Sequence, residues 1–360
     1  MMNTQINNQW FDQLKKDHAF IIAGPCSAET PEQVLDIAHS IKDVASIFRA
    51  GIWKPRTRPG GFEGVGSIGL EWLQRVKEET GLPLGVEIAT PEHVDLALKA
   101  DIDVLWIGAR TSVNPFAVQD IANALQGTDK IVMIKNPVNP DMALWLGGLE
   151  RLLKADIQKV ALIHRGFSTY EKTKYRNVPE WQIPLDVKAQ FPEIKMINDP
   201  SHITGNREMI FETSQTALNL NFDGLMIETH STPDQAWSDA AQQVTPETLK
   251  QIVHQLKTRD VSNSEESFQI SMKNYRTEID DLDSKILKLL NKRMHIVDEI
   301  GYLKKDKNVA VFQKDRWQEV LNKMKREAND FELGEEFITA LYKAIHQESI
   351  SRQGTIINKK

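Results

Sequence analysis

The run Phe20-Ile-Ile-Ala-Gly-Pro-Cys-Ser27 is a short apolar segment that stops at a Gly-Pro pair and places the only cysteine of the chain, Cys26, just past its end. Seven similar runs follow, separated by amphipathic helical stretches: residues 47–53, 84–88, 104–107, 131–135, 160–164, 194–197 and 224–227. Runs that are apolar almost throughout are typical of parallel strands covered on both faces. The first 257 residues are therefore predicted to alternate strands with helices.

Eight strand–helix units in roughly 250 residues favour an α/β fold of the (β/α)8, or TIM, barrel type. Helices are expected at residues 31–44, 70–80, 91–99 and 246–257 among others, and Thr30-Pro31 and Thr90-Pro91 are typical of an N-cap followed by a first helical turn. A doubly wound open sheet is the alternative. The functional site of a barrel is expected at the carboxyl ends of its strands.

The C-terminal part of the chain is predicted to be a separate all-α domain of three helices. Residues 258–270 are polar, carry no periodicity and indicate a linker between a first domain at 1–257 and a second at 271–360. Helices are expected at 272–305, 314–328 and 334–351. At 1.5 Å per residue the first is about 50 Å long, too long to bury its apolar stripe against two short helices. It is therefore expected to form a homodimer.

Composition excludes several classes of protein. The 360 residues carry a net charge of −6, and no part of the chain has the strong basic excess of a nucleic-acid-binding protein. No apolar run approaches the roughly 18 residues of a membrane span, and the N-terminus lacks the pattern of a signal peptide. A single cysteine excludes an intrachain disulfide framework, which favours the cytoplasm.

Four metal-donor side chains follow predicted strands. Cys26 follows the first strand, His202 and Glu228 end the runs Ile194-Lys-Met-Ile-Asn-Asp-Pro-Ser-His202 and Gly224-Leu-Met-Ile-Glu228, and Asp239 comes eleven residues later. A lone cysteine is often only a small buried hydrophobic residue. Because the other donors are placed alike, the pattern favours one divalent ion with mixed sulfur, nitrogen and oxygen ligands.

Cations also gather at the predicted strand ends: Arg49, Lys54, Arg110, Lys135 and Arg165. Gly51 would permit a bulge that brings both Arg49 and Lys54 to the barrel mouth. A solvated rim is the alternative interpretation, but charges at the inner ends of barrel strands are costly unless they have a partner. The cluster therefore indicates a site for substrates that carry phosphate and carboxylate groups.

Five ordered motifs in residues 15–257 resemble the type I-beta 3-deoxy-D-arabino-heptulosonate 7-phosphate (DAHP) synthases: Gly24-Pro-Cys-Ser27, Lys54-Pro-Arg-Thr57, Ile107-Gly-Ala-Arg110, His164-Arg-Gly166 and Asp199-Pro-Ser-His202. The sister enzyme that makes 3-deoxy-octulosonate phosphate usually has Lys-Ala-Asn-Arg in place of the second motif. The resemblance implies condensation of phosphoenolpyruvate with erythrose 4-phosphate to DAHP and phosphate, the first step of the shikimate pathway.

The resemblance also implies roles for individual residues. Metal ligands would be Cys26, His202, Glu228 and Asp239, holding Mn²⁺ in the first place, with Fe²⁺, Co²⁺ or Zn²⁺ as alternatives. Phosphoenolpyruvate would be held by Arg49, Lys54, Arg110, Lys135 and Arg165. Arg56 and Thr57 would hold the phosphate of erythrose 4-phosphate, and Lys54 would be catalytic as well.

Residues 272–353 resemble the all-helical chorismate mutases, which rearrange chorismate to prephenate. The matching positions are Arg276, Arg293, Lys304, Gln313, Arg316, Ser349 and Gln353. Arg293 and Lys304 share one helix face, whereas Arg276 lies 17 residues earlier and would reach the pocket of a partner chain in an antiparallel dimer. Solvated cations are the alternative. The family usually has Glu at Trp317 and commonly Asp at Gln313, so the contact to the chorismate hydroxyl differs here.

The sequence thus predicts a bifunctional enzyme whose helical domain also senses chorismate or prephenate and restrains the barrel. Two alternatives stay open. The helical domain could be a ligand-binding and dimerisation module with weak mutase activity, or a purely structural addition to a single-function barrel aldolase.

Overall fold

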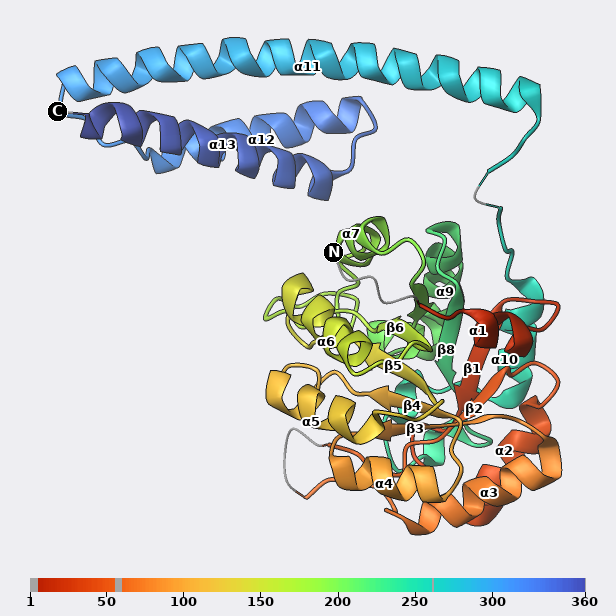
Figure 1. The fold of residues 1–360 in the computed structure, drawn as a ribbon. Helices are drawn as coiled ribbons and strands as arrows, with labels where there is room; N and C mark the ends of the chain where they lie inside the picture. Colours follow the sequence, from red (N-terminus) through yellow and green to blue (C-terminus); the bar gives the residue numbers. More distant parts are fainter. Residues whose placement is uncertain (1–5, 56–59, 261, 360) are drawn as a thin grey trace. The chain divides into compact units, whose positions relative to one another are not determined.

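The computed structural model describes residues 6–55, 60–260 and 262–359 (Figure 1). Within these residues, eight parallel strands form a closed barrel in the order in which they occur in the chain. The strands are β1 (Phe20–Gly24), β2 (Ile47–Arg49), β3 (Leu84–Ile88), β4 (Val104–Ile107), β5 (Ile131–Lys135), β6 (Val160–His164), β7 (Lys195–Asn198) and β8 (Gly224–Glu228). Because β1 pairs with β8, the barrel is confirmed and the open sheet is wrong.

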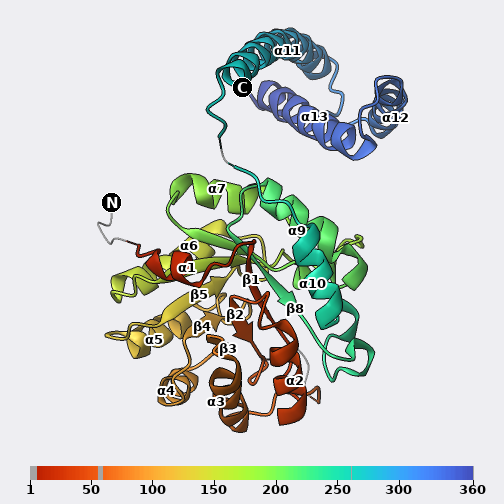
Figure 2. The same cartoon turned by 90° about the vertical axis from the view of Figure 1, so that its right-hand side faces the viewer.

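Helices surround the strands, as Figure 2 shows. They are α2 (Pro31–Ile41), α3 (Ile68–Thr80), α4 (Pro91–Lys99), α5 (Pro115–Leu125), α6 (Met142–Lys154), α7 (Gln182–Gln190), α8 (Pro200–Thr204), α9 (Ile210–Asn219) and α10 (Pro246–Gln255). The predicted caps are confirmed, since the hydroxyls of Thr30 and Thr90 accept from the backbone N–H groups of Gln33 and His93 at 3.1 and 3.3 Å.

The inside of the barrel is filled by alternate strand residues, and its amino-terminal end is closed by α1 (Gln9–Leu14). Trp10 and Phe11 of this helix are buried against Phe20, and the rings of Phe11 and Phe20 stack at 4.3 Å. Outward-facing strand residues pack against the surrounding helices in a second apolar cluster. With one end closed in this way, the carboxyl ends of the strands are left as the open face.

Strand β2 is shorter than the predicted run 47–53, because the chain turns toward the β1 loop after Arg49. The N–H of Ala28 donates to Gly51 O at 3.0 Å, and a Cβ on Gly51 would lie 2.2 Å from Cys26 O. Only glycine permits this close approach. The sequence suggested a bulge at Gly51, but the chain instead leaves the strand after Arg49. This turn brings the side chains of both Arg49 and Lys54 to Cys26 O.

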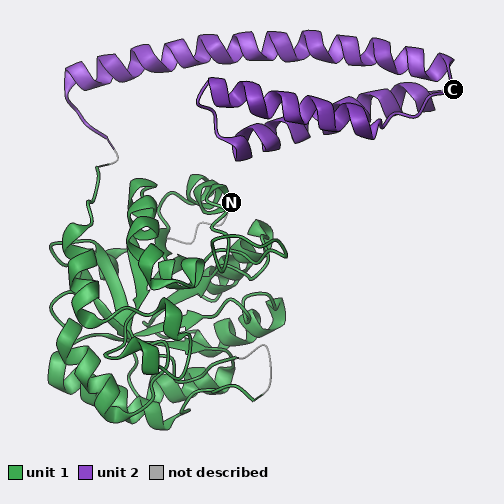
Figure 3. Cartoon of the chain, turned by 180° about the vertical axis from the view of Figure 1, so that it is seen from behind, with its two compact units in different colours: residues 1–261 green, residues 262–360 purple. Residues whose placement is uncertain are grey.

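The chain divides into two compact units, Met1–Val261 and Ser262–Lys360 (Figure 3). The second contains α11 (Glu266–Asp306), α12 (Lys314–Asp330) and α13 (Glu335–Asn358). Helix α11 begins inside the predicted linker 258–270, which is therefore shorter than expected. Residues 266–271 are exposed, so they needed no apolar stripe to be helical and gave no periodic signal.

Much of helix α11 has no packing partner among the described residues of its own unit. Met294, Val297 and Gly301 are buried in the C-terminal half of the helix, which packs against α13. In the N-terminal half, by contrast, the side chains of Ile279, Leu282 and Ile286 are each more than half exposed, and so is that of Leu289 just beyond it. None of the described helices is both long and apolar enough to cross a lipid bilayer.

We expect Gly24→Ala to destabilise the barrel far more than Gly127→Ala. Both glycines have positive φ, +146° and +80°, but a Cβ on Gly24 would lie 2.0 Å from Arg49 O, whereas Gly127 has open space. Left-handed strain alone costs about 1–2 kcal/mol, or roughly 2–8 °C in melting temperature. Scanning calorimetry of the full chain should show that Gly24→Ala lowers the melting temperature at least twice as much as left-handed strain alone would. Equal shifts would contradict the role of the close approach.

Candidate functional site

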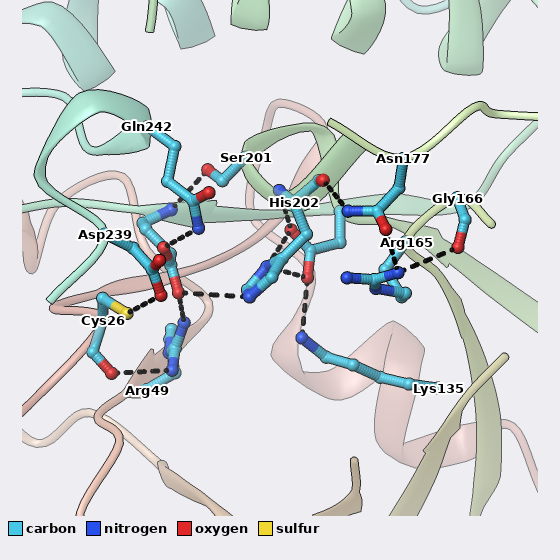
Figure 4. Close-up of polar contacts among 12 residues, drawn as sticks. Cys26, Arg49, Lys135, Arg165, Gly166, Asn177, Ser201, His202, Asp239 and Gln242 are labelled. Atoms are coloured by element: carbon cyan, nitrogen blue, oxygen red, sulfur yellow. Dashed lines mark hydrogen bonds and ion pairs between the residues drawn. The ribbon is translucent and has the colours of Figure 1, made fainter. Parts of the chain in front are cut away.

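The predicted residues of the barrel meet at the carboxyl ends of its strands (Figure 4). Cys26 follows β1, Arg49 ends β2, Lys135 ends β5, Arg165 follows β6 and Glu228 ends β8. His202 lies in α8 directly after β7, and Asp239 precedes a short 3-10 helix after β8. Arg56 and Thr57 lie outside the described residues. Donors and cations separated by up to about two hundred residues thus share one face of the barrel.

The four predicted metal donors approach one another in two pairs. Cys26 Sγ lies 3.4 Å from Asp239 Oδ2, and His202 Nε2 lies 3.8 Å from Glu228 Oε1. Two ligands of one divalent ion, each about 2.0–2.3 Å from it, are separated by similar distances. The chemistry and spacing of the donors therefore fit a mixed-ligand divalent ion. As placed, however, the His, Cys, Asp and Glu side chains of the described residues form no group of three or more that could hold one.

Protein cations contact the same donor atoms. Lys54 Nζ lies 2.9 Å from Cys26 Sγ and also contacts Cys26 O. Arg49 Nη1 donates to Glu228 Oε1 at 2.7 Å, with both side chains buried. These contacts explain how a thiol and two carboxylates can gather in a buried site, because each negative group has a positive neighbour.

Burial and charge set the protonation of the site. Burial, reinforced by the nearby Glu228, raises the pKa of the Cys26 thiol to about 11, against the opposing effect of Lys54. Burial also acts to raise the pKa of Glu228, but His202 and Arg49 outweigh it and hold that pKa well below its usual range. The carboxylate of Glu228 is thus ionised and ready to bind a metal ion. The Cys26 thiol needs a further positive charge, in addition to Lys54, to lose its proton.

Asp199 connects the donor pairs to the cations. Its carboxylate lies 2.7 Å from Lys135 Nζ and 2.8 Å from His202 Nδ1, and it is fully buried. Burial acts to raise the pKa of Asp199, but His202 and Lys135 hold it well below its usual value. A carboxylate on Nδ1 leaves Nε2 of His202 facing Glu228, which is how metal-binding histidines are oriented.

Arg165 and Arg110 belong to a cationic region beside this aspartate. The Nη1 atom of Arg165 donates to Asn177 Oδ1 at 2.6 Å and to Gly166 O at 3.3 Å. The pKa of Arg165 is lowered to about 10, chiefly by burial; Asp199 opposes this shift, and the nearby charges of Arg176 and Arg110 add to it. Arg110 itself is exposed. A buried arginine with further cations nearby forms a site suited to a highly charged anion.

Sequence reasoning missed four polar residues of the site. Asp199 lies inside a recognised motif but was given no role, although its position directly before Pro200 and His202 was a usable signal. Arg176 and Asn177 lie in an irregular segment and Gln242 ends a three-residue 3-10 helix, so no periodicity marks them. Each contacts a predicted site residue through its side chain.

In the second unit the structure brings together some of the predicted mutase residues. Arg293 Nη1 donates to Ser349 Oγ at 2.8 Å, and Gln353 follows one turn later, buried beside Gly301. Lys304 Nζ donates to Val311 O at 2.6 Å. Helices α11 and α13 thus place Arg293, Ser349 and Gln353 along one interface, and Lys304 reaches the segment between α11 and α12.

The other predicted mutase residues are more exposed. Arg316 pairs with Glu319 at the surface, Gln313 precedes the first turn of α12, and Arg276 is exposed on α11. Trp317 stacks on His346, with ring centroids 4.0 Å apart. The side chain that replaces the usual glutamate is therefore held by a neighbour from α13.

Comparison with known proteins identifies both parts of the chain. Residues 5–263 match the model of the DAHP synthetase I family. The chain belongs to this family. Residues 275–354 match the model of chorismate mutase type II. The predicted combination of a DAHP synthase domain with a C-terminal chorismate mutase domain is confirmed.

Curated relatives resemble the barrel unit. A phospho-2-dehydro-3-deoxyheptonate aldolase of Thermotoga maritima is 30% identical over 239 residues, which cover 66% of this chain and 68% of that protein. A 2-dehydro-3-deoxyphosphooctonate aldolase of Nitratidesulfovibrio vulgaris is 29% identical over 238 residues, 61% of this chain and 84% of that protein. The crystal structure of a DAHP synthase from Thermotoga maritima aligns with a TM-score of 0.59 and 28% identity, covering 66% of this chain and 67% of that one.

We expect His164, the histidine of the His-Arg-Gly motif, to make barrel stability depend on pH. Its Nε2 contacts Pro179 O at 2.6 Å and its Nδ1 contacts Asn198 Nδ2 at 3.1 Å, and burial lowers its pKa from 6.5 to about 4. The folded state therefore binds a proton less readily than the unfolded state. The neutral His164 side chain therefore stabilises the fold in full above pH 6.5. As pH falls toward 4 the free energy of unfolding declines, by about 1 kcal/mol between pH 7 and 5.5.

Urea unfolding of the full chain at these two pH values, in wild type and His164→Gln, measures this contribution. The variant should lose about 1 kcal/mol less than wild type on acidification, because glutamine does not titrate. An equal pH dependence in both proteins would show that His164 does not carry the effect.

Proposed function

We propose that this chain condenses phosphoenolpyruvate with erythrose 4-phosphate in its barrel and rearranges chorismate to prephenate in its helical unit. The observation that carries the barrel activity is the Lys135–Asp199–His202 connection, which joins an anion-binding cluster to a set of metal donors. Membership of the DAHP synthetase I family supports the same substrates.

In the barrel, cations would hold phosphoenolpyruvate by its phosphate and carboxylate. The residues proposed for this are Arg49, Lys54, Arg110, Lys135 and Arg165. Lys135 and Arg165 are buried, so their contacts to an anion act in a region of low dielectric constant and cost little reorganisation. Arg56 and Thr57, which lie outside the described residues, are proposed to hold the phosphate of erythrose 4-phosphate.

Cys26, His202, Glu228 and Asp239 are the residues that would hold a divalent ion, Mn²⁺ in the first place and Fe²⁺, Co²⁺ or Zn²⁺ as alternatives. The ion would supply Lewis-acid polarisation of the aldehyde. Lys54, whose Nζ lies beside Cys26 Sγ, would donate a hydrogen bond or a proton to the aldehyde oxygen as negative charge develops there.

The bond changes follow from this arrangement. The C3 atom of phosphoenolpyruvate attacks the aldehyde carbon, and the new carbon–carbon bond leaves C2 electron-poor. Water adds at C2 and loses a proton, and the C2–O bond to the phosphate then breaks. The product retains the phosphate of erythrose 4-phosphate, and inorganic phosphate comes from phosphoenolpyruvate.

For the helical unit we propose that Arg293, Lys304 and Arg316 hold the two carboxylates of chorismate, with Ser349 and Gln353 as hydrogen-bonding partners. Lys304 and Gln353 would stabilise the charge that develops on the ether oxygen. The exposed apolar stripe of α11 would pack on a second copy, whose Arg276 would complete the pocket. Arg293 now contacts Ser349, so a ligand carboxylate would find the guanidinium already oriented.

A second candidate role of the helical unit is feedback control of the barrel by chorismate or prephenate. The Trp317–His346 stack favours it, because a ring here replaces the glutamate usual in the family. A pocket altered in this way would still bind chorismate or prephenate while it catalyses the rearrangement only slowly.

Two variants of the full chain test whether each unit carries only one of the two proposed activities. Lys304→Ala should lower chorismate turnover at least a hundredfold and leave phosphate release from phosphoenolpyruvate and erythrose 4-phosphate unchanged, because the two clusters lie in separate units. Lys54→Met should do the reverse. Each variant is the control of the other, and undiminished chorismate turnover in Lys304→Ala would refute the mutase assignment.

Feedback is testable by measuring DAHP formation with and without prephenate. A coupling of 1–3 kcal/mol, the usual allosteric range, would lower synthase activity about five- to 150-fold in wild type. Arg293→Ala should abolish the response, because it weakens the contact to a carboxylate of prephenate. A chain ending at Thr258 should also be insensitive. If all three proteins respond alike, or none does, the helical unit does not regulate the barrel.

A further inference from the structure

Both carboxylates among the metal donors have one oxygen held by a neutral or positive side chain and the other facing a second donor. Asp239 Oδ1 accepts from Arg176 Nη1 at 2.9 Å, while its Oδ2 lies 3.4 Å from Cys26 Sγ. Glu228 Oε2 accepts from Gln242 Nε2 at 2.6 Å, while its Oε1 lies 3.8 Å from His202 Nε2 and also accepts from Arg49 Nη1 at 2.7 Å. The outer oxygen of each carboxylate is thus fixed, and the inner one faces the other donors.

Arg176 and Gln242 are also joined to each other. Arg176 Nη1 donates to Gln242 Oε1 at 2.5 Å, so the amide nitrogen of Gln242 must turn toward Glu228. The chemistry allows only this orientation of the amide, because a guanidinium needs an acceptor and a carboxylate needs a donor. Asp239, Arg176, Gln242 and Glu228 therefore form one continuous chain of hydrogen bonds, part of which Figure 4 shows.

The backbone at Asp239 makes this support necessary. Its φ of +48° lies in the left-handed region, which costs a non-glycine residue free energy and persists only where the surroundings hold it. The contact with Arg176 is a charge-assisted hydrogen bond that holds the side chain in this conformation.

Arg176 is anchored from the opposite side, by the segment that carries His202. Its N–H donates to Thr204 O at 3.3 Å, and a Cβ on Gly205 would lie 2.7 Å from Arg176 Cβ. The next residue, Asn177, donates from Nδ2 to His202 O at 2.7 Å. One short segment thus fixes both the guanidinium that holds Asp239 and the backbone of the histidine donor.

We propose that Arg176 and Gln242 are positioning residues that orient both carboxylate ligands of a divalent ion. The inference rests on the proposed metal site, and it concerns residues that touch neither the ion nor the substrates. Residues that hydrogen-bond metal ligands typically change metal affinity 10- to 100-fold when they are removed. Because the two side chains act through one hydrogen-bond chain, their losses are not additive.

The test is Mn²⁺ binding to the metal-free full-length protein, measured from the electron paramagnetic resonance signal of free Mn²⁺ without any substrate. Arg176→Met and Gln242→Leu should each raise the Kd 10- to 100-fold, and the double variant should be less impaired than the product of the two effects. Arg176→Lys should recover much of the loss, because an ammonium group can still donate to Asp239.

Arg207→Met is the matched control. Arg207 Nη2 reaches the same loop through Ala240 O at 2.7 Å and Asp234 Oδ1 at 2.8 Å, but it touches none of the four donors. Its Kd should stay within about twofold of wild type. Melting temperatures of all variants identify any loss due to unfolding, and Gln242→Leu tests the inference without a change of charge.

The direction of the effect is decisive. If Arg176 acted only as a positive charge that repels the ion, Arg176→Met would bind Mn²⁺ more tightly, and that result would overturn the proposal. Unchanged Kd values for both single variants would overturn it as well while leaving the metal site intact. If wild type itself bound no Mn²⁺, the proposed metal site would fail together with this inference.

Discussion

The pairing of β1 with β8 is the constraint on which the barrel and its open face depend. Five residue pairs, from Phe20 opposite Gly224 to Gly24 opposite Glu228, close the barrel and bring the two ends of the unit together. Cys26 follows this pairing by two residues, and Thr229 N donates to Gly24 O at 2.8 Å. The same ladder that completes the backbone hydrogen bonds therefore sets a thiol beside a carboxylate.

Charge balance explains why this arrangement is stable. Glu228 is buried at the end of β8, and an isolated buried carboxylate would cost several kcal/mol. Arg49 from β2, on the far side of β1 from β8, neutralises it, and Lys135 does the same for Asp199. The cations that balance these buried charges are thus among those proposed to bind the anionic substrate. Substrate binding would redistribute contacts that already exist, which is the preorganisation expected of an active site.

The helical unit differs from the barrel in how its apolar side chains are covered. Its helices are paired along only part of α11, and apolar side chains such as Ile279 and Leu289 remain exposed on the rest. A second copy of the chain would cover them, and the proposed pocket needs an arginine from that copy. Folding, dimerisation and ligand binding of this unit are therefore expected to be linked, whereas the barrel closes its own core.

By itself the sequence determined the eight strands, the gathering of candidate donors and cations at the strand ends, and the helical unit. These depend on local patterns: apolar runs of strand length, prolines behind strands, and helical spacing. Only the tertiary structure decided that β2 ends at Arg49, that Lys54 reaches Cys26, and that Arg176, Asn177 and Gln242 hold the donors. The physical reason is that these side chains lie in irregular segments or a short 3-10 helix and find partners up to 66 residues away, so their hydrogen bonds exist only once the barrel has closed.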